Sequence, residues 1–348
     1  MMKIRGRMVG ARFGTYVIAE MSANHGQSFE QAVEIVKAAK NAGADAVKLQ
    51  TYTPDTITID SGDEIFQTAK GSLWEGRTLY ELYGEAYTPW EWQPKLKEIA
   101  EEIGLACFST PFDFTAVDFL EKMDAPAYKI ASPEIIDLPL VRRVAATGKP
   151  VIISTGMASL VEIEEAVHAF REAGGNDIAL LKCTSAYPAR TEEMNLRTIP
   201  DLAKRFAVPV GLSDHTLGIA VPAAAVALGA CIVEKHLTLS RSTPGPDSAF
   251  SLEPHEFKQM VDAIRVAEKA LGQVKYGLTE AEQLSRRSRR SLFVVQDVKA
   301  GERLTPDNVR SIRPGYGLPP KHYEEVIGRL AARDMQRGTP LQWDAIAT

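Results

Sequence analysis

Polar and ionisable residues stand at the ends of eight short apolar runs in this sequence. The runs are YVIAEM (16–21), DAVKLQ (45–50), LACFST (105–110), AYKIAS (127–132), PVIIST (150–155), IALLKC (178–183), VPVGLS (208–213) and CIVEKH (231–236). Residues in or soon after them include Glu20, Lys48, Gln50, Thr110, Lys129, Ser132, Glu134, Ser154, Ser185, Tyr187, Ser213, His215 and His236. The ends of apolar runs are often more polar than their middles, but eight such ends in succession favour one shared functional site.

Two lysines and several hydroxyl groups in this set indicate a site for an anion. Lys48 and Lys129 would supply positive charge to a phosphate or carboxylate group. Hydroxyl donors to the same oxyanion would come from Thr110, Ser132, Ser154, Ser185 and Ser213. A buried lysine can instead form a Schiff base, as in class I aldolases, and the sequence alone leaves that route open. The number of neutral donors favours anion binding.

Two histidines end neighbouring apolar runs and predict a metal site. His215 follows the seventh run and His236 ends the eighth, so we expect their imidazoles to approach one cation. Two histidines together with a carboxylate or water suit Mn²⁺, Fe²⁺ or Zn²⁺. His25, in the first connection, is a weaker third candidate.

The elements that would position these residues alternate along the chain. The apolar runs have the length and composition of strands that are buried on both faces. Amphipathic helices are predicted between them, most clearly over 28–41, before Gly43, and over 160–173, before Gly174. Eight such βα units by about residue 275 predict a (β/α)₈ barrel, in which strand ends converge on one face. A doubly wound sheet is the alternative, but no GxGxxG follows the first run.

The chain of 348 residues is predicted to divide into a large and a small domain. We expect a catalytic barrel over 1–280, a linker over 281–290 and a small β-rich module over 291–348 with little core of its own. The longest insertion, 51–88, should follow a strand at the carboxyl end of the barrel and belong to an active-site lid. The sequence does not reveal which of its aromatic residues matter.

Composition excludes several classes of protein. A net charge of −5 argues against coating nucleic acid, and no apolar stretch reaches the length of a membrane-spanning helix. The three cysteines show no metal-binding spacing, so we expect buried thiols in a reducing compartment. A cytoplasmic protein without nucleic-acid or membrane partners is therefore expected.

Ten stretches in order resemble the sialic acid synthase family, whose members condense phosphoenolpyruvate with N-acetylated aldoses. They are IAEMSANH (18–25), GADAVKLQTYTPD (43–55), STPF (109–112), YKIASPE (128–134), STGMAS (154–159), KCTSAYP (182–188), GLSDHT (211–216), EKHLTL (234–239), GPDSAFSLEP (245–254) and RPGYGLPP (313–320). Three of them, AEMSANH, KLQTYTPD and KCTSAYP, look like the pseudaminic acid synthase branch. Ordinary sialic acid synthases more often have asparagine in place of Ser185.

The resemblance implies a role for individual residues. Phosphoenolpyruvate contacts fall on Lys48, Thr110, Lys129, Ser132, Ser154, Ser185 and Ser213, and sugar contacts on Glu20, Gln50, Tyr187, Asp247 and Arg313. The metal ligands fall on His215 and His236, and Glu134 matches the proposed general base. Lys48 and Lys129 would assist catalysis by holding the carboxylate and phosphate in place.

The resemblance also implies the reaction and the partners. A TIM barrel followed by an antifreeze-like (SAF) domain would form a domain-swapped homodimer, in which Arg313 reaches the sugar site of the other subunit. The expected metal is Mn²⁺, with Mg²⁺ or Co²⁺ as alternatives. The expected reaction joins phosphoenolpyruvate to 2,4-diacetamido-2,4,6-trideoxy-L-altrose through C–O cleavage. Three alternatives are an N-acetylneuraminate or legionaminate synthase, another phosphoenolpyruvate–aldose condensing enzyme, and a non-catalytic sugar-binding barrel.

Overall fold

The computed structural model describes residues 2–347 and divides into two compact units, Met1–Gly272 and Gln273–Thr348. No helix among the described residues combines the length and apolar character needed to cross a bilayer.

The first unit is a closed barrel of eight parallel strands in the order β10-β3-β4-β5-β6-β7-β8-β9. The strands are β3 (Tyr16–Glu20), β4 (Ala46–Thr51), β5 (Ala106–Pro111), β6 (Tyr128–Ile130), β7 (Val151–Ser154), β8 (Ile178–Cys183), β9 (Val210–Asp214) and β10 (Ile232–His236). Each overlaps one of the eight apolar runs, and β4, β5 and β9 extend one residue beyond theirs, so the predicted barrel is confirmed and the doubly wound alternative is wrong.

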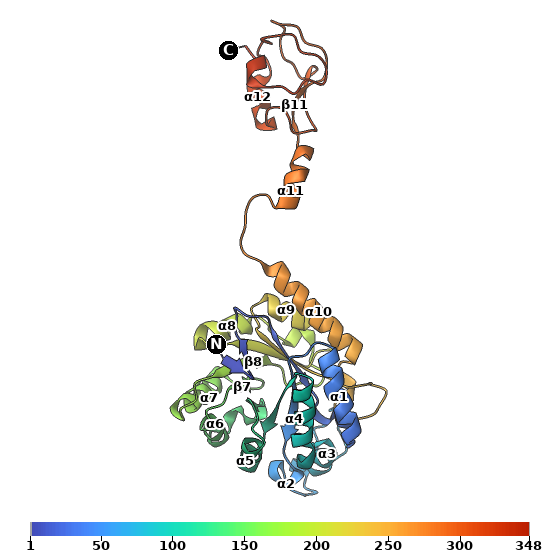
Figure 1. Ribbon diagram of the computed structural model, residues 1–348, viewed down its shortest axis with the longest axis vertical. Helices are drawn as coiled ribbons and strands as arrows, with labels where there is room; N and C mark the ends of the chain where they lie inside the picture. Colours follow the sequence, from blue (N-terminus) through green and yellow to red (C-terminus); the bar gives the residue numbers. More distant parts are fainter. Residues whose placement is uncertain (1, 348) are drawn as a thin grey trace. The chain divides into compact units, whose positions relative to one another are not determined.

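Helices cover the outer face of the barrel (Figure 1). They are α1 (Phe29–Asn41), α4 (Gln93–Glu102), α5 (Phe114–Lys122), α6 (Leu138–Ala145), α7 (Leu160–Glu172), α8 (Thr198–Phe206), α9 (Ala220–Ala227) and α10 (Pro254–Leu271). The two helices predicted most clearly are α1 and α7. The hydroxyl of Ser28 accepts a hydrogen bond from the amide of Gln31 and starts α1. Its buried face, with Ile35 and Val36, belongs to the same apolar cluster as the strand residues Val17 and Val47.

The amino end of the barrel is closed by an antiparallel hairpin of β1 (Met2–Ile4) and β2 (Arg7–Val9). Met2, Ile4 and Val9 are buried in one apolar cluster with barrel residues such as Ile18 and Phe108. Apolar side chains therefore fill the interior of the barrel at this end.

The insertion over 51–88 is not a featureless loop. It contains α2 (Pro54–Ile57), the short 3₁₀ helix η2 (Glu64–Phe66) and α3 (Leu79–Ala86). Gln27, in the first βα connection, donates hydrogen bonds from Nε2 to the carbonyl oxygens of Glu85 (2.9 Å) and Tyr87 (2.7 Å). The insertion is therefore held against the connection that follows β3.

The second unit has an apolar core of its own, contrary to the expectation from its composition. Strands β11 (Ser291–Val294) and β12 (Val309–Ile312) pair antiparallel, and isolated bridges and the short helix α12 (Tyr323–Val326) complete the fold. Twelve buried residues, among them Leu292, Leu304 and Leu341, form one cluster. Before β11, the chain forms α11 (Glu280–Ser285) and a 3₁₀ turn, η7 (Arg286–Ser288).

Candidate active site

Strand register places ionisable residues of three neighbouring strands at one level of the barrel. Glu20, the last residue of β3, pairs in register with Lys48 of β4 on one side and with His236 of β10 on the other. All three side chains are buried. The carboxyl end of the barrel therefore collects charge in its interior, as the apolar runs predicted.

Lys48 is surrounded by two carboxylates and a hydroxyl. Its ammonium forms an ion pair with Glu20, lies 3.8 Å from Oε1 of Glu234 and donates a 3.2 Å hydrogen bond to Oγ1 of Thr110. Burial alone would lower the pKa of Lys48, but Glu20 and Glu234 outweigh it and raise that pKa. Burial raises the pKa of Glu20 to about 7, although Lys48 opposes it. The lysine therefore stays charged in the barrel interior.

Lys129 is the second buried cation. It donates hydrogen bonds from Nζ to Oγ of Ser154 (2.6 Å) and to the carbonyl of Ile130 (2.9 Å). Burial lowers its pKa, and the positive charge of Lys48 acts in the same direction. For Glu234, burial would raise the pKa, but Lys48 and Lys129 outweigh it and hold that pKa below its usual value. Two ammonium groups and two carboxylates thus form one buried network.

Serine hydroxyls gather where β6, β7 and β8 end. The amide of Gly156 donates a 3.0 Å hydrogen bond to Oγ of Ser132. A Cβ atom at position 156 would collide with the hydroxyls of both Ser185 and Ser132, so only glycine leaves this space open. From β9, Ser213 donates to Glu234 at 3.1 Å. These residues form a cradle of hydroxyl groups beside the two lysines.

His215 and His236 lie together, with ring centroids 5.4 Å apart. Nδ1 of His215 is 3.0 Å from the carbonyl oxygen of Thr184, and an N–H donated there leaves the lone pair of the ring on Nε2. Nδ1 of His236 is buried without a hydrogen-bond partner, and burial holds the pKa of His236 well below its usual value. Each ring thus keeps one nitrogen without a protein partner, and two such imidazoles side by side fit a divalent metal.

The two histidines are not part of a larger ligand cluster. Within residues 2–347, no three or more His, Cys, Asp or Glu side chains are grouped so that they could hold a metal ion. A metal at the histidine pair would therefore take its other ligands from water or substrate. His25 is placed elsewhere: Nδ1 accepts a hydrogen bond from the amide of Gln27, and Nε2 lies 3.3 Å from the hydroxyl of Thr88.

Glu134 stands next to the serine cradle, in the 3₁₀ helix η4 (Pro133–Ile136). Its Oε2 atom is buried without a hydrogen-bond partner. Burial raises the pKa of Glu134 to about 7, and the charge of Lys129 only partly opposes this. A carboxylate with this pKa is suited to accept a proton near neutral pH.

The residues expected to contact the sugar are linked through Ser22. The hydroxyl of Ser22 donates to the carboxylate of Asp247, and it accepts a 2.9 Å hydrogen bond from Nε2 of Gln50. The amide of Ser22 donates to Oε1 of Glu20 at 3.0 Å. The ring of Tyr187 lies 4.4 Å from that of His215. Four of the five predicted sugar residues thus border one region.

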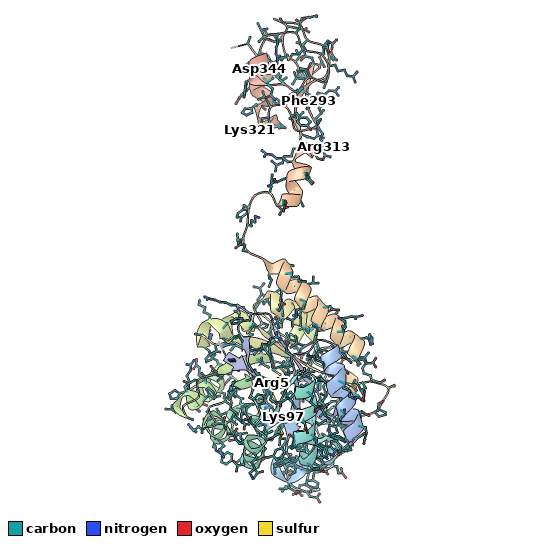
Figure 2. All side chains as sticks on the ribbon, in the orientation of Figure 1. Arg5, Lys97, Phe293, Arg313, Lys321 and Asp344 are labelled. Carbon is teal, nitrogen blue, oxygen red and sulfur yellow. The ribbon has the colours of Figure 1, made fainter. Side chains whose placement is uncertain are left out.

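The fifth predicted sugar residue, Arg313, belongs to the second unit (Figure 2). It follows β12 directly and is exposed.

Several residues that the structure brings into this site have no role in the predictions from the sequence. Glu234 lies in the eighth run and has no predicted function, although its carboxylate is 3.8 Å from Lys48, and Lys129 also lowers its pKa. Ser22 and Trp74 carried no signal of their own. They could have been found only from partners far away in sequence, such as Asp247 for Ser22 and Pro246 for Trp74.

Comparison with known proteins agrees with this architecture. Residues 35–276 match the model of the NeuB family, and residues 289–347 match that of the SAF domain. The pseudaminic acid synthase of Campylobacter jejuni strain 81-176 is 48% identical over 94% of this chain and 95% of its own length. That of Helicobacter pylori is 44% identical over 95% of this chain and 97% of its own.

A solved structure gives the same picture. The N-acetylneuraminic acid synthetase of Leptospira borgpetersenii, in complex with citrate, superposes with a TM-score of 0.72 at 32% identity, over 82% of this chain and 94% of the other. The family model spans more than half of the chain, and the relatives exceed 30% identity over nearly all of it. This protein is a member of the NeuB family, with a SAF domain after its barrel.

Proposed function

We propose that this protein catalyses the pseudaminic acid synthase reaction, joining phosphoenolpyruvate to 2,4-diacetamido-2,4,6-trideoxy-L-altrose with release of phosphate. The observation that carries the proposal is the buried network of Lys48, Lys129 and serine hydroxyls beside the paired rings of His215 and His236. Relatives that are 44–48% identical over nearly the whole chain are named pseudaminic acid synthases, and the choice of sugar rests on that name. They also assign the protein to the transferases that form a carbon–carbon bond.

Phosphoenolpyruvate carries a carboxylate and a phosphate, and the buried lysines offer one cation to each. Thr110 and Ser154 already accept hydrogen bonds from Lys48 and Lys129, so they hold both ammonium groups in place. Ser132 and Ser185 would add donors around the anion, and Ser213 would join them by exchanging its hydrogen bond to Glu234 for one to the substrate. Because these groups are fixed before the substrate arrives, much of the rate enhancement would come from positioning.

His215 and His236 would hold the metal, on which synthases of this family generally depend. A divalent metal bound there would polarise the aldehyde carbonyl of the sugar. We propose Mn²⁺, with Mg²⁺ and Co²⁺ as alternatives.

Glu134 is the proposed general base. C3 of phosphoenolpyruvate attacks the aldehyde carbon, and Glu134 removes a proton from the water that adds to C2. The tetrahedral C2 centre then expels phosphate together with the bridging oxygen, which leaves a 2-keto acid. A carboxylate without a protein partner beside an anion site is suited to this step and has no use in a non-catalytic sugar-binding protein.

The sugar would lie against Glu20, Gln50, Tyr187 and Asp247, and Arg313 would come from the SAF domain of a second subunit in a domain-swapped homodimer. The dimer and the cytoplasmic location expected from the sequence stay predictions.

Turnover with a panel of acetamido aldoses tests the proposal. Phosphate release is measured with phosphoenolpyruvate, Mn²⁺ and either the diacetamido sugar, the legionaminate precursor or N-acetylmannosamine. We expect the highest kcat/KM with 2,4-diacetamido-2,4,6-trideoxy-L-altrose. Preference for either of the other sugars would assign the protein to another branch.

A further inference from the structure

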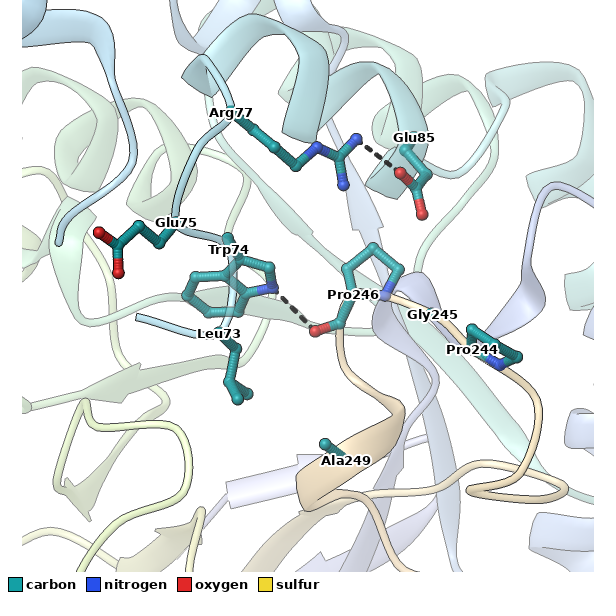
Figure 3. A pocket seen from close by; sticks show the side chains of 9 residues that line it. All are labelled: Leu73, Trp74, Glu75, Arg77, Glu85, Pro244, Gly245, Pro246 and Ala249. Atoms are coloured by element: carbon teal, nitrogen blue, oxygen red, sulfur yellow. Dashed lines mark hydrogen bonds and ion pairs between the residues drawn. The ribbon is translucent and has the colours of Figure 1, made fainter. Parts of the chain in front are cut away.

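A pocket of about 270 Å³ lies between two connecting segments on the sugar side of the site (Figure 3). One wall comes from the insertion, with Leu73, Trp74, Arg77 and Glu85. The other comes from the connection between β10 and α10, over 244–249. The residues of this pocket are not among those expected to bind substrate.

Trp74 joins this pocket to the proposed sugar site. Its indole Nε1 donates a 2.8 Å hydrogen bond to the carbonyl of Pro246, the residue before Asp247 (Figure 3). Its ring centroid lies 5.8 Å from that of Tyr187. Trp74 therefore touches the segment that carries one proposed sugar ligand and the side chain of another.

The position of Trp74 is fixed by its own segment. The buried hydroxyl of Thr68 lies within hydrogen-bonding distance of the carbonyl oxygens of Trp74 (2.7 Å) and Arg77 (3.0 Å). Gln67 and Thr78 pair as an antiparallel bridge across this turn. The bridge and these hydrogen bonds close the loop over 67–78, which fixes the backbone that carries the indole.

The pocket suits a neutral group with an apolar end. Arg77 is paired with Glu85 at 2.6 Å, so its charge is not left for an anion, and the carboxylate of Glu75, which accepts a hydrogen bond from the amide of Gly71, would repel one. The remaining lining is Leu73, Trp74 and the prolines and Ala249 of the opposite wall. Leu73 is 51% exposed, so a ligand that covers its apolar surface would bind more favourably.

We propose that Trp74 determines sugar specificity by packing its indole against the acetamido group at C4 of the aldose. This inference rests on the proposed function, because it concerns the substituent that separates the diacetamido sugar from a mono-acetamido sugar. An acetamido group has a methyl group for the apolar lining and an amide that can lie flat on an aromatic face. A hydroxyl group at C4 would leave this surface uncovered.

The test compares two sugars that differ only at C4: the diacetamido substrate and its analogue with a hydroxyl group there. For Trp74→Ala we expect kcat/KM to fall roughly 10- to 100-fold with the diacetamido sugar and by less than about 3-fold with the analogue. The KM for phosphoenolpyruvate should not change. Trp74→Phe keeps an aromatic face without the N–H and should retain most of the discrimination.

Trp90→Phe is a control for Trp74→Phe. Like Trp74, Trp90 donates its Nε1 proton to a backbone carbonyl, here that of Tyr52, but its ring packs against Phe119 outside the pocket. Trp90→Phe should leave the ratio between the two sugars unchanged. If Trp74→Ala lowered kcat/KM equally with both sugars, so that the wild-type preference remained, this inference would be overturned and the proposed function would not. A wild-type enzyme without preference for the diacetamido sugar would overturn the proposed function together with it.

Discussion

The anion side and the sugar side of the candidate site are built from different parts of the barrel. On the anion side, Lys48 and Lys129 stand within strands and are almost fully buried among hydrogen-bond partners. On the sugar side, Trp74 and Asp247 lie on connecting segments, and exposed surface such as Leu73 borders the pocket. On this proposed division, strand residues hold the two cations of the anion side, and connections, which tolerate change, would carry the choice of sugar together with the strand residues Glu20 and Gln50.

This comparison predicts two kinds of mutational effect. Changes on the anion side should impair turnover with every sugar alike, whereas changes on the sugar side should alter the preference between sugars.

Removing a strand-borne charge should have the largest effect. We expect Lys129→Met to lower kcat/KM by about 10²–10³-fold with all sugars, because the substrate anion loses a charged donor in a buried site. Phosphate-release kinetics with varied phosphoenolpyruvate measure this loss. Lys37→Met, which removes an exposed lysine paired with Glu34, serves as the control. An unchanged KM and kcat for Lys129→Met would show that the anion binds elsewhere.

Glu134→Gln should remove a comparable part of the rate, about 10²–10⁴-fold, since the glutamine cannot accept a proton. In the wild type, kcat should rise as the pH passes through about 7, where Glu134 loses its proton. The variant should lack this rise, which a pH–rate profile of both proteins detects. The exposed Glu172→Gln is expected to keep the wild-type profile.

The same substitution should change stability in a pH-dependent way. Burial raises the pKa of Glu134 to about 7, so its stabilising contribution is complete below the unfolded pKa of about 4.3 and is lost as the pH rises through about 7. The Tm of Glu134→Gln minus the Tm of the wild type should therefore be more positive at pH 8, where the wild type carries a buried charge, than at pH 5. A difference in Tm independent of pH would contradict a buried, ionising Glu134.

Metal affinity should decrease when either histidine is removed. We expect His236→Ala to weaken Mn²⁺ binding by at least about 10-fold, with the preference between sugars unchanged in the remaining activity. Calorimetric titration of the purified variant measures this without turnover. His168→Ala, on the exposed face of α7, should bind Mn²⁺ as the wild type does.

The smallest effect is expected on the sugar side. Gln27→Ala removes two hydrogen bonds that hold the end of the insertion, each contributing about 0.5–1.5 kcal/mol. We expect KM for the sugar to rise a few-fold and KM for phosphoenolpyruvate to stay constant. Gln67→Ala, whose exposed side chain bonds only within the insertion, should change neither. Equal changes in both KM values would contradict a division between the two sides.

The strands and the anion side could be predicted because they follow local patterns. The apolar runs fix the strands, parallel topology brings their ends together, and the polar residues at those ends must then meet. The resemblance added roles for individual residues. The cradle at Gly156 was not predicted, because it depends on hydroxyls from two other strand ends and on the absence of a Cβ atom.

The sugar side could be predicted only in part, because it depends on contacts between distant segments. Trp74 and Pro246 are 172 positions apart, and no periodicity connects them. His25 was considered a metal candidate, but the amide of Gln27 and the hydroxyl of Thr88 occupy its nitrogens. In the second unit, apolar residues spaced by Gly and Pro turns suggested little core, yet the turns bring them into one cluster.

Isotope transfer from phosphoenolpyruvate labelled with ¹⁸O in its bridging C–O position tests the proposed reaction most directly. The enzyme turns over this substrate with the diacetamido sugar and Mn²⁺, and mass spectrometry locates the label in both products. C–O cleavage predicts that the label leaves with phosphate. Label retained in the 2-keto acid would mean that the P–O bond breaks, which contradicts the proposed route of attack by water at C2.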